Sequence, residues 1–263
     1  RLKGQESPKD KHVFTPAVFV SGYPLRSPDF SIRAFYKKSF RMPTFNDLYY
    51  ADMGNSKLNP EHVTQYNAGI LYDRVRRGVV NTIRIGADVY YNTVRDKIVA
   101  YPKGQQFRWT MLNLGRVRIK GVDVTALVTV NPVSDLMLTL RAQYTFQRAI
   151  DVTDPSDNYY RDQIPYIPRN SGACVFNASW HGWNLNYSWI YVGERYNQQE
   201  NIRYNYTQPW YTSDVSISKD LKIKKVSLRA MAEINNLLSQ DYDVIINYPM
   251  PKRNFRFTIV AEI

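Results

Sequence analysis

The chain has 263 residues, enough for one large all-β domain or two ordinary domains, and its formal net charge is +12 at pH 7. Aromatic residues make up 14% of the sequence and the mean hydropathy is −0.46, so many rings share segments with polar side chains. The basic residues are dispersed, which argues against nucleic acid as a partner, and the single cysteine, Cys174, excludes an internal disulfide.

No run of 18 apolar residues occurs, which excludes a membrane-spanning helix. A transmembrane β-barrel stays possible, because its strands need only about 10 alternating residues. The sequence starts at Arg1 without an initiator methionine or the apolar core of a signal peptide. We therefore expect it to be a fragment.

Apolar and polar residues alternate with a period of two along most of the chain, which is typical of strands with one wet face. Leu138, Leu140 and Ala142 share one parity, for example, and Arg141 and Gln143 the other. Aromatic residues lie at one end of the apolar parity in several strands, where a membrane barrel carries its aromatic girdle. We expect about eleven strands, near residues 13–22, 29–39, 62–73, 79–93, 113–130, 135–148, 171–180, 183–194, 210–219, 224–235 and 254–263.

One expected strand changes parity. Val117 and Ile119 are odd, whereas Val122 and Val124 are even. We predict a β-bulge at Lys120–Gly121 that absorbs the extra residue.

The expected connections alternate strictly between short and long. The short ones are residues 23–29, 74–78, 131–134, 181–182 and 220–223, and the long ones are residues 40–61, 94–112, 149–170, 195–209 and 236–253. Outer-membrane barrels have short periplasmic turns and long extracellular loops. This pattern therefore predicts an antiparallel transmembrane β-barrel in the bacterial outer membrane, with the long loops outside.

Eleven strands cannot be a whole barrel, because bacterial single-chain barrels have an even number. Open edges would also leave backbone groups unsatisfied in hydrocarbon, at several kcal/mol each. Eleven is half of 22, the size of the plugged outer-membrane transporters. We therefore expect the all-β chain to be half of a 22-stranded barrel.

Two stretches within the first long connection carry a family pattern. Residues 40–50 read FRMPTFNDLYY and residues 54–61 read GNSKLNPE, followed by YNAGI from Tyr66. They resemble one extracellular loop of TonB-dependent outer-membrane receptors. The residues that carry the resemblance are Phe40, Arg41, Pro43, Asn59, Pro60 and Glu61. We expect the prolines to fix φ and remove donors where the loop leaves the sheet, and Gly54 permits a positive φ there.

Three later stretches resemble the same family in the same order. They are MLNLGRVRIKGVDV from Met111, IPYIPRN from Ile164, and INNLLSQDYDVIINYPMPKRNFRFTIVAEI at the C-terminal end. The last departs from the family at Leu238, where Phe is usual, at Lys252 in place of Gly, and at Ile263 in place of the terminal aromatic residue. Together the matches cover residues 12–263.

The resemblance implies a receptor that binds a scarce small ligand outside the cell and passes it through a plugged barrel, with energy from TonB. The contacts with TonB belong to a plug and an N-terminal box, which we expect to be absent from this chain. Residues 1–12 are expected to be the remnant of an extracellular loop, and residues 13–263 the C-terminal half of the barrel. The other expected partner is outer-membrane lipid, and no cofactor or metal is expected.

An enzyme is not expected. None of the three histidines, His12, His62 and His181, pairs by spacing with a nucleophile or a metal ligand. Two alternatives stay open, a soluble all-β binding or adhesion module and an outer-membrane barrel enzyme that depends on His62.

The sequence narrows the class of ligand only in part. Haem receptors of this family usually carry a histidine between the two loop motifs, and none lies between Arg41 and Leu58, so haem ranks below cobalamin and ferric siderophores. Three long loops mix arginine with tyrosine and tryptophan, which suits an anionic, aromatic-rich ligand. The candidate contacts are Arg108, Trp109, Tyr160, Arg203, Tyr206 and Trp210. The alternative is that these residues cap the barrel mouth or anchor it at the lipid interface.

Overall fold

A computed structural model describes residues 13–51, 53–103, 108–223 and 226–262. Within them, eleven strands form one antiparallel sheet in which sequential neighbours pair, which confirms the expected fold class. The strands are β1 (Ala17–Gly22), β2 (Phe30–Arg41), β3 (Glu61–Val75), β4 (Val80–Lys103), β5 (Arg108–Val130), β6 (Leu136–Asp151), β7 (Asn170–Trp180), β8 (Trp183–Val192), β11 (Trp210–Ile223), β12 (Val226–Asn235) and β15 (Asn254–Glu262).

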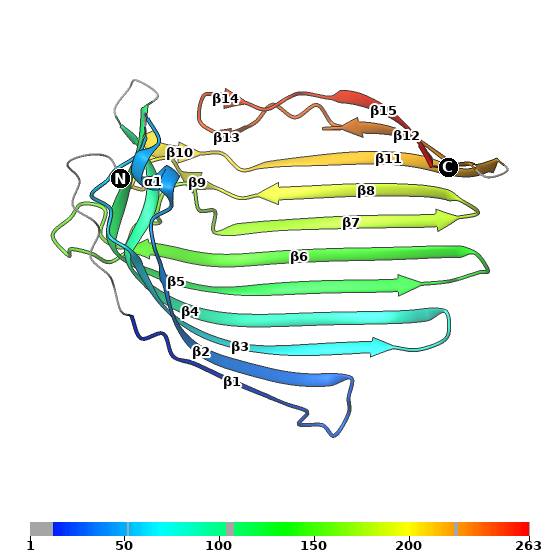
Figure 1. Cartoon of the computed structure of the whole chain (residues 1–263), viewed down its shortest axis with the longest axis horizontal. Helices are drawn as coiled ribbons and strands as arrows, with labels where there is room; N and C mark the ends of the chain where they lie inside the picture. The colour runs from blue at the N-terminus through cyan, green and yellow to red at the C-terminus, as the bar shows by residue number, and fades with distance from the viewer. Residues whose placement is uncertain (1–12, 52, 104–107, 224–225, 263) are drawn as a thin grey trace.

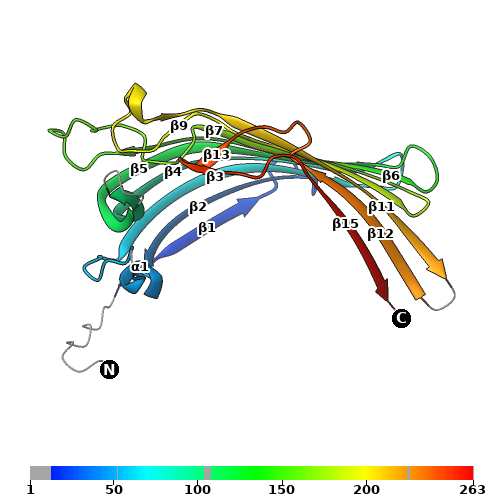
Figure 2. The same cartoon turned by 90° about the horizontal axis from the view of Figure 1, so that it is seen from above.

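The sheet is a single curved layer. Figure 2 shows it bent into an arch, with β1 at one edge and β15 at the other. Among the described residues, each edge strand pairs on one side only. Phe257 and Ile259 of β15 are 80% and 74% exposed, as expected of an edge with an uncovered apolar face. No helix in the described ranges is long and apolar enough to cross a membrane.

Short turns join the strands at one end of the sheet and long connections at the other, as Figure 1 shows. The long connections contain α1 (Phe45–Tyr49), β9 (Arg195–Tyr196), η1 (Arg203–Asn205), β10 (Tyr206–Thr207), β13 (Asp243–Ile245) and β14 (Tyr248–Pro249). The expectation of a loop over residues 94–112 is wrong for most of that range. β4 and β5 continue as a paired hairpin from Val94↔Val117 to Lys103↔Arg108, because backbone pairing continues beyond the point where the apolar alternation stops.

One face of the sheet is apolar from edge to edge. The register aligns Leu140 with Val128 on one side and with Phe176 on the other, and the same rows continue through Tyr187 and Val215. Many of these side chains are exposed, including Leu140 at 42% and Val89 at 52%. In an outer-membrane barrel the face of this character is directed to lipid.

The opposite face is polar and carries ion pairs across neighbouring strands. Examples are Arg84–Asp73 and Arg229–Asp220, both 2.6 Å between nitrogen and oxygen, and Arg256–Glu233. The pair Arg33–Asp88 (2.6 Å) even spans the intervening strand β3. It does so over Gly69, where a Cβ atom would collide with the Asp88 carboxylate. This face has the polar character of a barrel lumen.

The bulge expected at Lys120–Gly121 is absent. The register of β5 with both neighbours runs through these residues without a shift. The odd-numbered Val117 instead lies on the polar face at the loop end, where it is fully buried beneath the connection that follows β6. The change of parity therefore marks a loop that covers the lumen face, and the strand itself stays regular.

Arginine at Leu140 on the apolar face should destabilise the protein in lipid by about 2–4 kcal/mol, because a guanidinium would face hydrocarbon near the membrane midplane. The matched change Gln143→Arg, three residues along the same strand on the polar face, should be close to neutral. Denaturant unfolding in lipid vesicles measures both. Equal destabilisation by the two variants would contradict this assignment of the faces.

Candidate ligand site at the loop end of the sheet

The connection between β2 and β3 is held by one nearly buried carboxylate. Glu61, 4% exposed, accepts hydrogen bonds from Nε of Arg41 (2.7 Å) and from the backbone nitrogen of Ile98 (2.7 Å). Nζ of Lys97 lies 3.5 Å from Oε1 of the same carboxylate. Charged hydrogen bonds of this kind are about twice as strong as neutral ones. Glu61 therefore fastens the end of β2 and the extension of β4 to the start of β3.

The same connection folds back on α1. Thr44 caps this helix, because its side chain accepts from the backbone nitrogen of Asp47 while the Asp47 carboxylate accepts from the backbone nitrogen of Thr44. The chain then turns so tightly at Gly54 that a Cβ atom would lie 2.6 Å from the backbone nitrogen of Tyr50. Gly54 does not use the positive φ that a glycine permits, since Gly78 and Gly182 are the described glycines that have one. Close approach is the reason for a glycine here.

Asn59 joins this connection to the β4–β5 hairpin. The backbone nitrogen of Asn59 donates to Oδ1 of Asn113 (2.8 Å), and Nδ2 of Asn113 donates to the carbonyl oxygens of Asn59 (3.0 Å) and Asp96 (2.7 Å). Two of the recognised stretches, NPE and LNLG, are thus joined by hydrogen bonds.

Three of the six motif residues, Arg41, Asn59 and Glu61, anchor the loop through hydrogen bonds. Pro60 is buried, and Pro43 lies in the short segment between Arg41 and α1. Phe40 packs against His62 with a centroid distance of 5.2 Å. None of the six lines the aromatic pocket described below.

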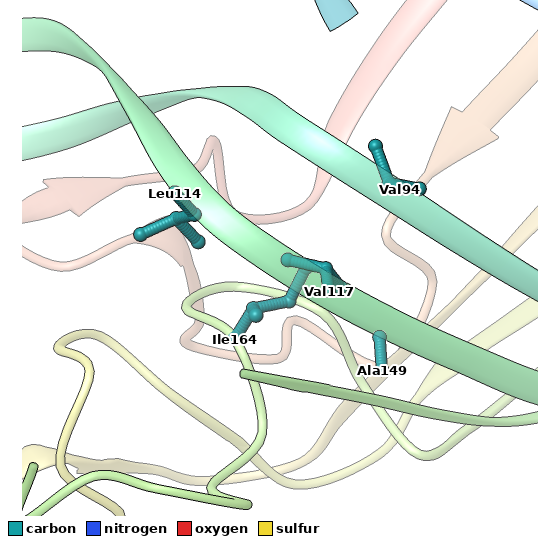
Figure 3. Close-up of a cluster of buried hydrophobic side chains, with 5 residues drawn as sticks. All are labelled: Val94, Leu114, Val117, Ala149 and Ile164. Carbon is teal, nitrogen blue, oxygen red and sulfur yellow. The ribbon is translucent and has the colours of Figure 1, made fainter. Parts of the chain in front are cut away.

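The connection after β6 folds over the polar face. Ile164 from this connection packs on Val94, Leu114 and Val117 of the extended hairpin and on Ala149 of β6, as Figure 3 shows. It is the main apolar cluster of the described residues. Since the spanning part of the sheet has no second layer, this cluster is where the loop end is packed like a soluble domain.

A buried amide links this loop to the next one. Gln163, 2% exposed, accepts from the backbone nitrogen of Ala149 (3.2 Å) and donates to the carbonyl oxygen of Ile167 (3.1 Å). Its backbone exchanges two hydrogen bonds with the Asn201 side chain, of 2.7 and 3.0 Å. The loops after β6 and β8 are therefore fastened to each other.

A buried arginine links the loop after β8 to the loop after β12. Arg195, 3% exposed, donates to the carbonyl oxygens of Gln208 (3.3 Å), Asp243 (2.7 Å) and Val244 (3.1 Å). Burial lowers the pKa of its guanidinium, and the nearby Tyr166 and Asp243 oppose that shift. The cation is solvated by backbone oxygens, so it holds the loops together without presenting charge to a ligand.

An open aromatic pocket of about 350 Å³ lies beside the loop segments that this arginine joins. Trp210 and Tyr242 stack in it with a centroid distance of 4.6 Å and an interplanar angle of 30°. The indole nitrogen of Trp210 is buried and has no hydrogen-bond partner among the described residues. The lining residues are Tyr206, Thr207, Gln208, Pro209, Trp210, Asp241, Tyr242, Asp243 and Ile246. The pocket offers flat apolar surface together with two carboxylates.

The structure brings together part of the candidate set. Tyr206 and Trp210 line this pocket. Trp109 lies nearby, because its ring packs on that of Tyr166 with a centroid distance of 5.7 Å. The backbone nitrogen of Tyr166 in turn donates to the carbonyl oxygen of Tyr196 in the loop after β8. Tyr160 is half-buried beneath its own neighbour, Arg161, at 5.4 Å, and lies outside the pocket lining.

Arg203, one of the two candidate arginines, is not among the described residues that line the pocket. Arg203 begins η1 and is exposed. Arg108 begins β5, and its side chain lies outside the described part of the structure.

Sequence reasoning missed the residues that complete the pocket. Asp241, Tyr242 and Asp243 belong to the closing stretch QDYDV, whose match to the receptor pattern was the available signal. No sequence pattern could have identified Arg195, because a single arginine in a loop does not show that backbone carbonyl oxygens will surround it in the fold. Across the described residues, no group of three or more His, Cys, Asp or Glu side chains could hold a metal ion.

Residues 3–237 match the protein family described as "TonB dependent receptor-like, beta-barrel". The vitamin B12 transporter BtuB of Photobacterium profundum is 25% identical over 230 residues, covering 83% of this chain and 33% of that protein. The vitamin B12 transporter BtuB of Vibrio vulnificus is 34% identical over 88 residues, covering 34% of this chain and 13% of that protein. The chain therefore spans about a third or less of the length of these relatives.

Solved structures share the fold. The ferric citrate transporter FecA in its unliganded form superimposes with a TM-score of 0.69 at 14% identity, over 94% of this chain and 37% of that one. The copper transporter OprC superimposes with a TM-score of 0.66 at 17% identity, over 93% of this chain and 38% of that one.

Removal of the Glu61 carboxylate should loosen the loop end. Glu61→Ala leaves Arg41 and the Ile98 backbone nitrogen without their partner, and should cost roughly 1–3 kcal/mol. Asp29→Ala, which removes the exposed ion pair with Arg76, should cost about 0–1 kcal/mol. Hydrogen exchange of the β3–β4 region and denaturant unfolding measure the difference. Equal effects would show that Glu61 is no anchor.

Proposed function

Since the chain belongs to the family of TonB-dependent receptors, we propose that it forms part of the wall and the ligand-binding loops of a receptor that takes up a scarce small ligand. The chain is an outer-membrane β-barrel protein, as members of this family are. The family consists of transporters and receptors, and the proposed chemistry is binding and release without bond cleavage. The observation that carries the proposal is the aromatic pocket at the loop end of the sheet.

The proposed place of the chain is the C-terminal half of a 22-stranded barrel, formed by residues 13–263. Within the described part of the chain, β1 and β15 each pair on one side only, which supports this because backbone groups at an open edge are costly in hydrocarbon. Residues 1–12, expected to be the remnant of an extracellular loop, lie outside the described residues. A plug in the lumen and contact of that plug with TonB complete the proposal, and the polar, ion-paired face suits a lumen.

The proposed orientation places the long connections outside the cell. The aromatic pocket then opens where a ligand arrives, above the lumen. Its lining comes from the loops after β8 and β12, which Arg195 holds together. A soluble binding module is disfavoured, because large apolar side chains are exposed along a whole face of the sheet.

The ligand class proposed first is cobalamin, with ferric siderophores second. Relatives named as vitamin B12 transporters support this order. The chemistry of the pocket supports it too, because its described lining includes the carboxylates of Asp241 and Asp243, and Lys252, which pairs with Asp241 at 3.0 Å, lies outside that lining. Carboxylates repel a polyanionic ferric chelate, whereas stacked rings suit a large ligand with flat apolar surface. The arginines of the loops led us to expect an anionic ligand, and the carboxylates of this pocket disfavour one.

Equilibrium binding of cobalamin and of a ferric catecholate siderophore to the intact purified receptor tests the proposal. Tyr206→Ala should weaken cobalamin binding by about 1–2 kcal/mol, or about 5- to 30-fold, since a pocket wall is lost. Tyr204→Ala is the matched control, because this tyrosine is 89% exposed and outside the pocket lining. Equal losses in both variants, or no cobalamin binding by the wild type, would contradict the proposal.

A further inference from the structure

The apolar face of β2, β3 and β4 carries a second feature, distinct from the ligand pocket. At the loop end of this face, Lys38, His62 and Arg95 lie on adjacent strands, and all three are exposed. The register pairs His62 with Arg95, and it pairs Lys38 with Thr64 one row below. These residues share the parity of the lipid-directed face. They are therefore directed away from the lumen.

A groove of about 510 Å³ gathers these side chains. Two threonine hydroxyls, from Thr64 and Thr93, lie in it beside the basic groups, and Asp96 is its one carboxylate. Among the described residues, none of the three basic side chains forms an ion pair. The groove lining also includes Val13, Phe14, Thr15, Ser39 and Val63. Three basic groups and four hydroxyl side chains against one carboxylate favour an anion that accepts several hydrogen bonds.

The positive charge continues sideways along the same face. The register places Arg116 beside Arg95, Arg118 beside Thr93, and Lys120 beside Tyr91, and it then pairs Lys120 with Arg148. The basic groups therefore form a band over three neighbouring rows at the loop end of β2 to β6, which would draw anionic headgroups toward the groove.

A row of tyrosines lies directly below the row of Lys38, Thr64 and Thr93, on the same strands. Tyr36 and Tyr66 are 5.2 Å apart between ring centroids, and Tyr66 and Tyr91 are 6.4 Å apart. Aromatic rings of this kind lie at the boundary between hydrocarbon and headgroups. The row thus marks that boundary on these strands.

A larger apolar groove of about 540 Å³ lies below the tyrosines on the same strands. Its floor is low because three of its residues are small: Ala34 pairs with Ala68, and Ala87 lies diagonally beside Ala68, opposite Ile70. Val20, Ile32, Ile70 and Val89 supply its larger apolar side chains. Ala34 is four residues from Lys38, roughly 13 Å along a strand. The two grooves are therefore within the reach of one lipid molecule.

We propose that the outer face of β2–β4 is a binding site for a lipid of the outer leaflet with a phosphorylated headgroup. The phosphate lies among Lys38, His62 and Arg95, and an acyl chain fills the groove over the three alanines. The order of charge, rings and apolar surface along the strands matches the order of headgroup, interface and chain in such a lipid. The inference depends on the proposed function only for placing the loop end at the outer leaflet.

Titration of the intact, detergent-purified receptor with lipid A that carries both phosphates, followed by native mass spectrometry, tests the site. The double variant Lys38→Gln/Arg95→Gln should weaken binding at least tenfold. The control Arg77→Gln, an exposed cation in the β3–β4 turn at the opposite end, should have no effect. Dephosphorylated lipid A should bind more weakly to the wild type and be insensitive to the double variant.

The apolar groove is tested in the same titration. Ala68→Leu should weaken binding of both lipids, because it fills the groove, whereas Ala142→Leu on the same face, outside the groove, should not. Ala34→Leu is a second variant in case Ala68→Leu fails to fold. Equal binding of the two lipids by the wild type, or equal effects of the double variant and Arg77→Gln, would overturn the inference.

These measurements are independent of the transported ligand. Loss of cobalamin binding with intact lipid discrimination would overturn the proposed function alone. Cobalamin binding without lipid discrimination would overturn the lipid site alone.

Discussion

The backbone has to satisfy its own hydrogen bonds in a solvent that offers none. In hydrocarbon each unsatisfied amide or carbonyl costs several kcal/mol, which leaves a continuous antiparallel ladder as the way for these strands to cross. The ladder of this chain runs without a break from β1 to β15. It fixes the period of two, and the period fixes which residues meet lipid and which meet the lumen. The rows of apolar side chains and the ion pairs behind them both follow from that requirement.

Outside hydrocarbon the requirement is relaxed, and other interactions take over. The loop end combines an apolar cluster around Val117 with buried polar groups that each bind several backbone atoms. Gln163 and Arg195 connect loops that the sheet itself does not pair, and Glu61 joins β2, β3 and β4 at their loop ends. Such groups are costly to bury unless all their hydrogen bonds are made. They therefore specify one arrangement of the loops, and that arrangement determines the shape of the pocket around Trp210.

The sequence predicted the membrane-spanning part of the fold well for the same reason. Alternation is local, so Leu138 and Arg141 could be assigned to opposite faces without knowledge of their neighbours. The loops could not be treated in this way. Val117 appeared to require a bulge, because its partner Ile164 is far along the chain and the contact is set by tertiary packing. Arg203 appeared to be a ligand contact and is exposed on η1, whereas Asp243 and Tyr242 line the pocket from a loop that was noted only for its family pattern.

Alternation also lets one short stretch of chain serve two environments. Glu61 is directed to the lumen side and anchors the motif loop, and the next residue, His62, is directed to lipid in the basic groove. Val94 and Arg95 likewise lie on opposite faces: Val94 packs under Ile164, and Arg95 lines the basic groove. The loop packing and the lipid surface of β3 and β4 are therefore joined by single peptide bonds. A lipid held at Lys38 and Arg95 would restrain the same strand ends that Glu61 fastens from inside, so the rigidity of the loop end depends on both faces of the wall.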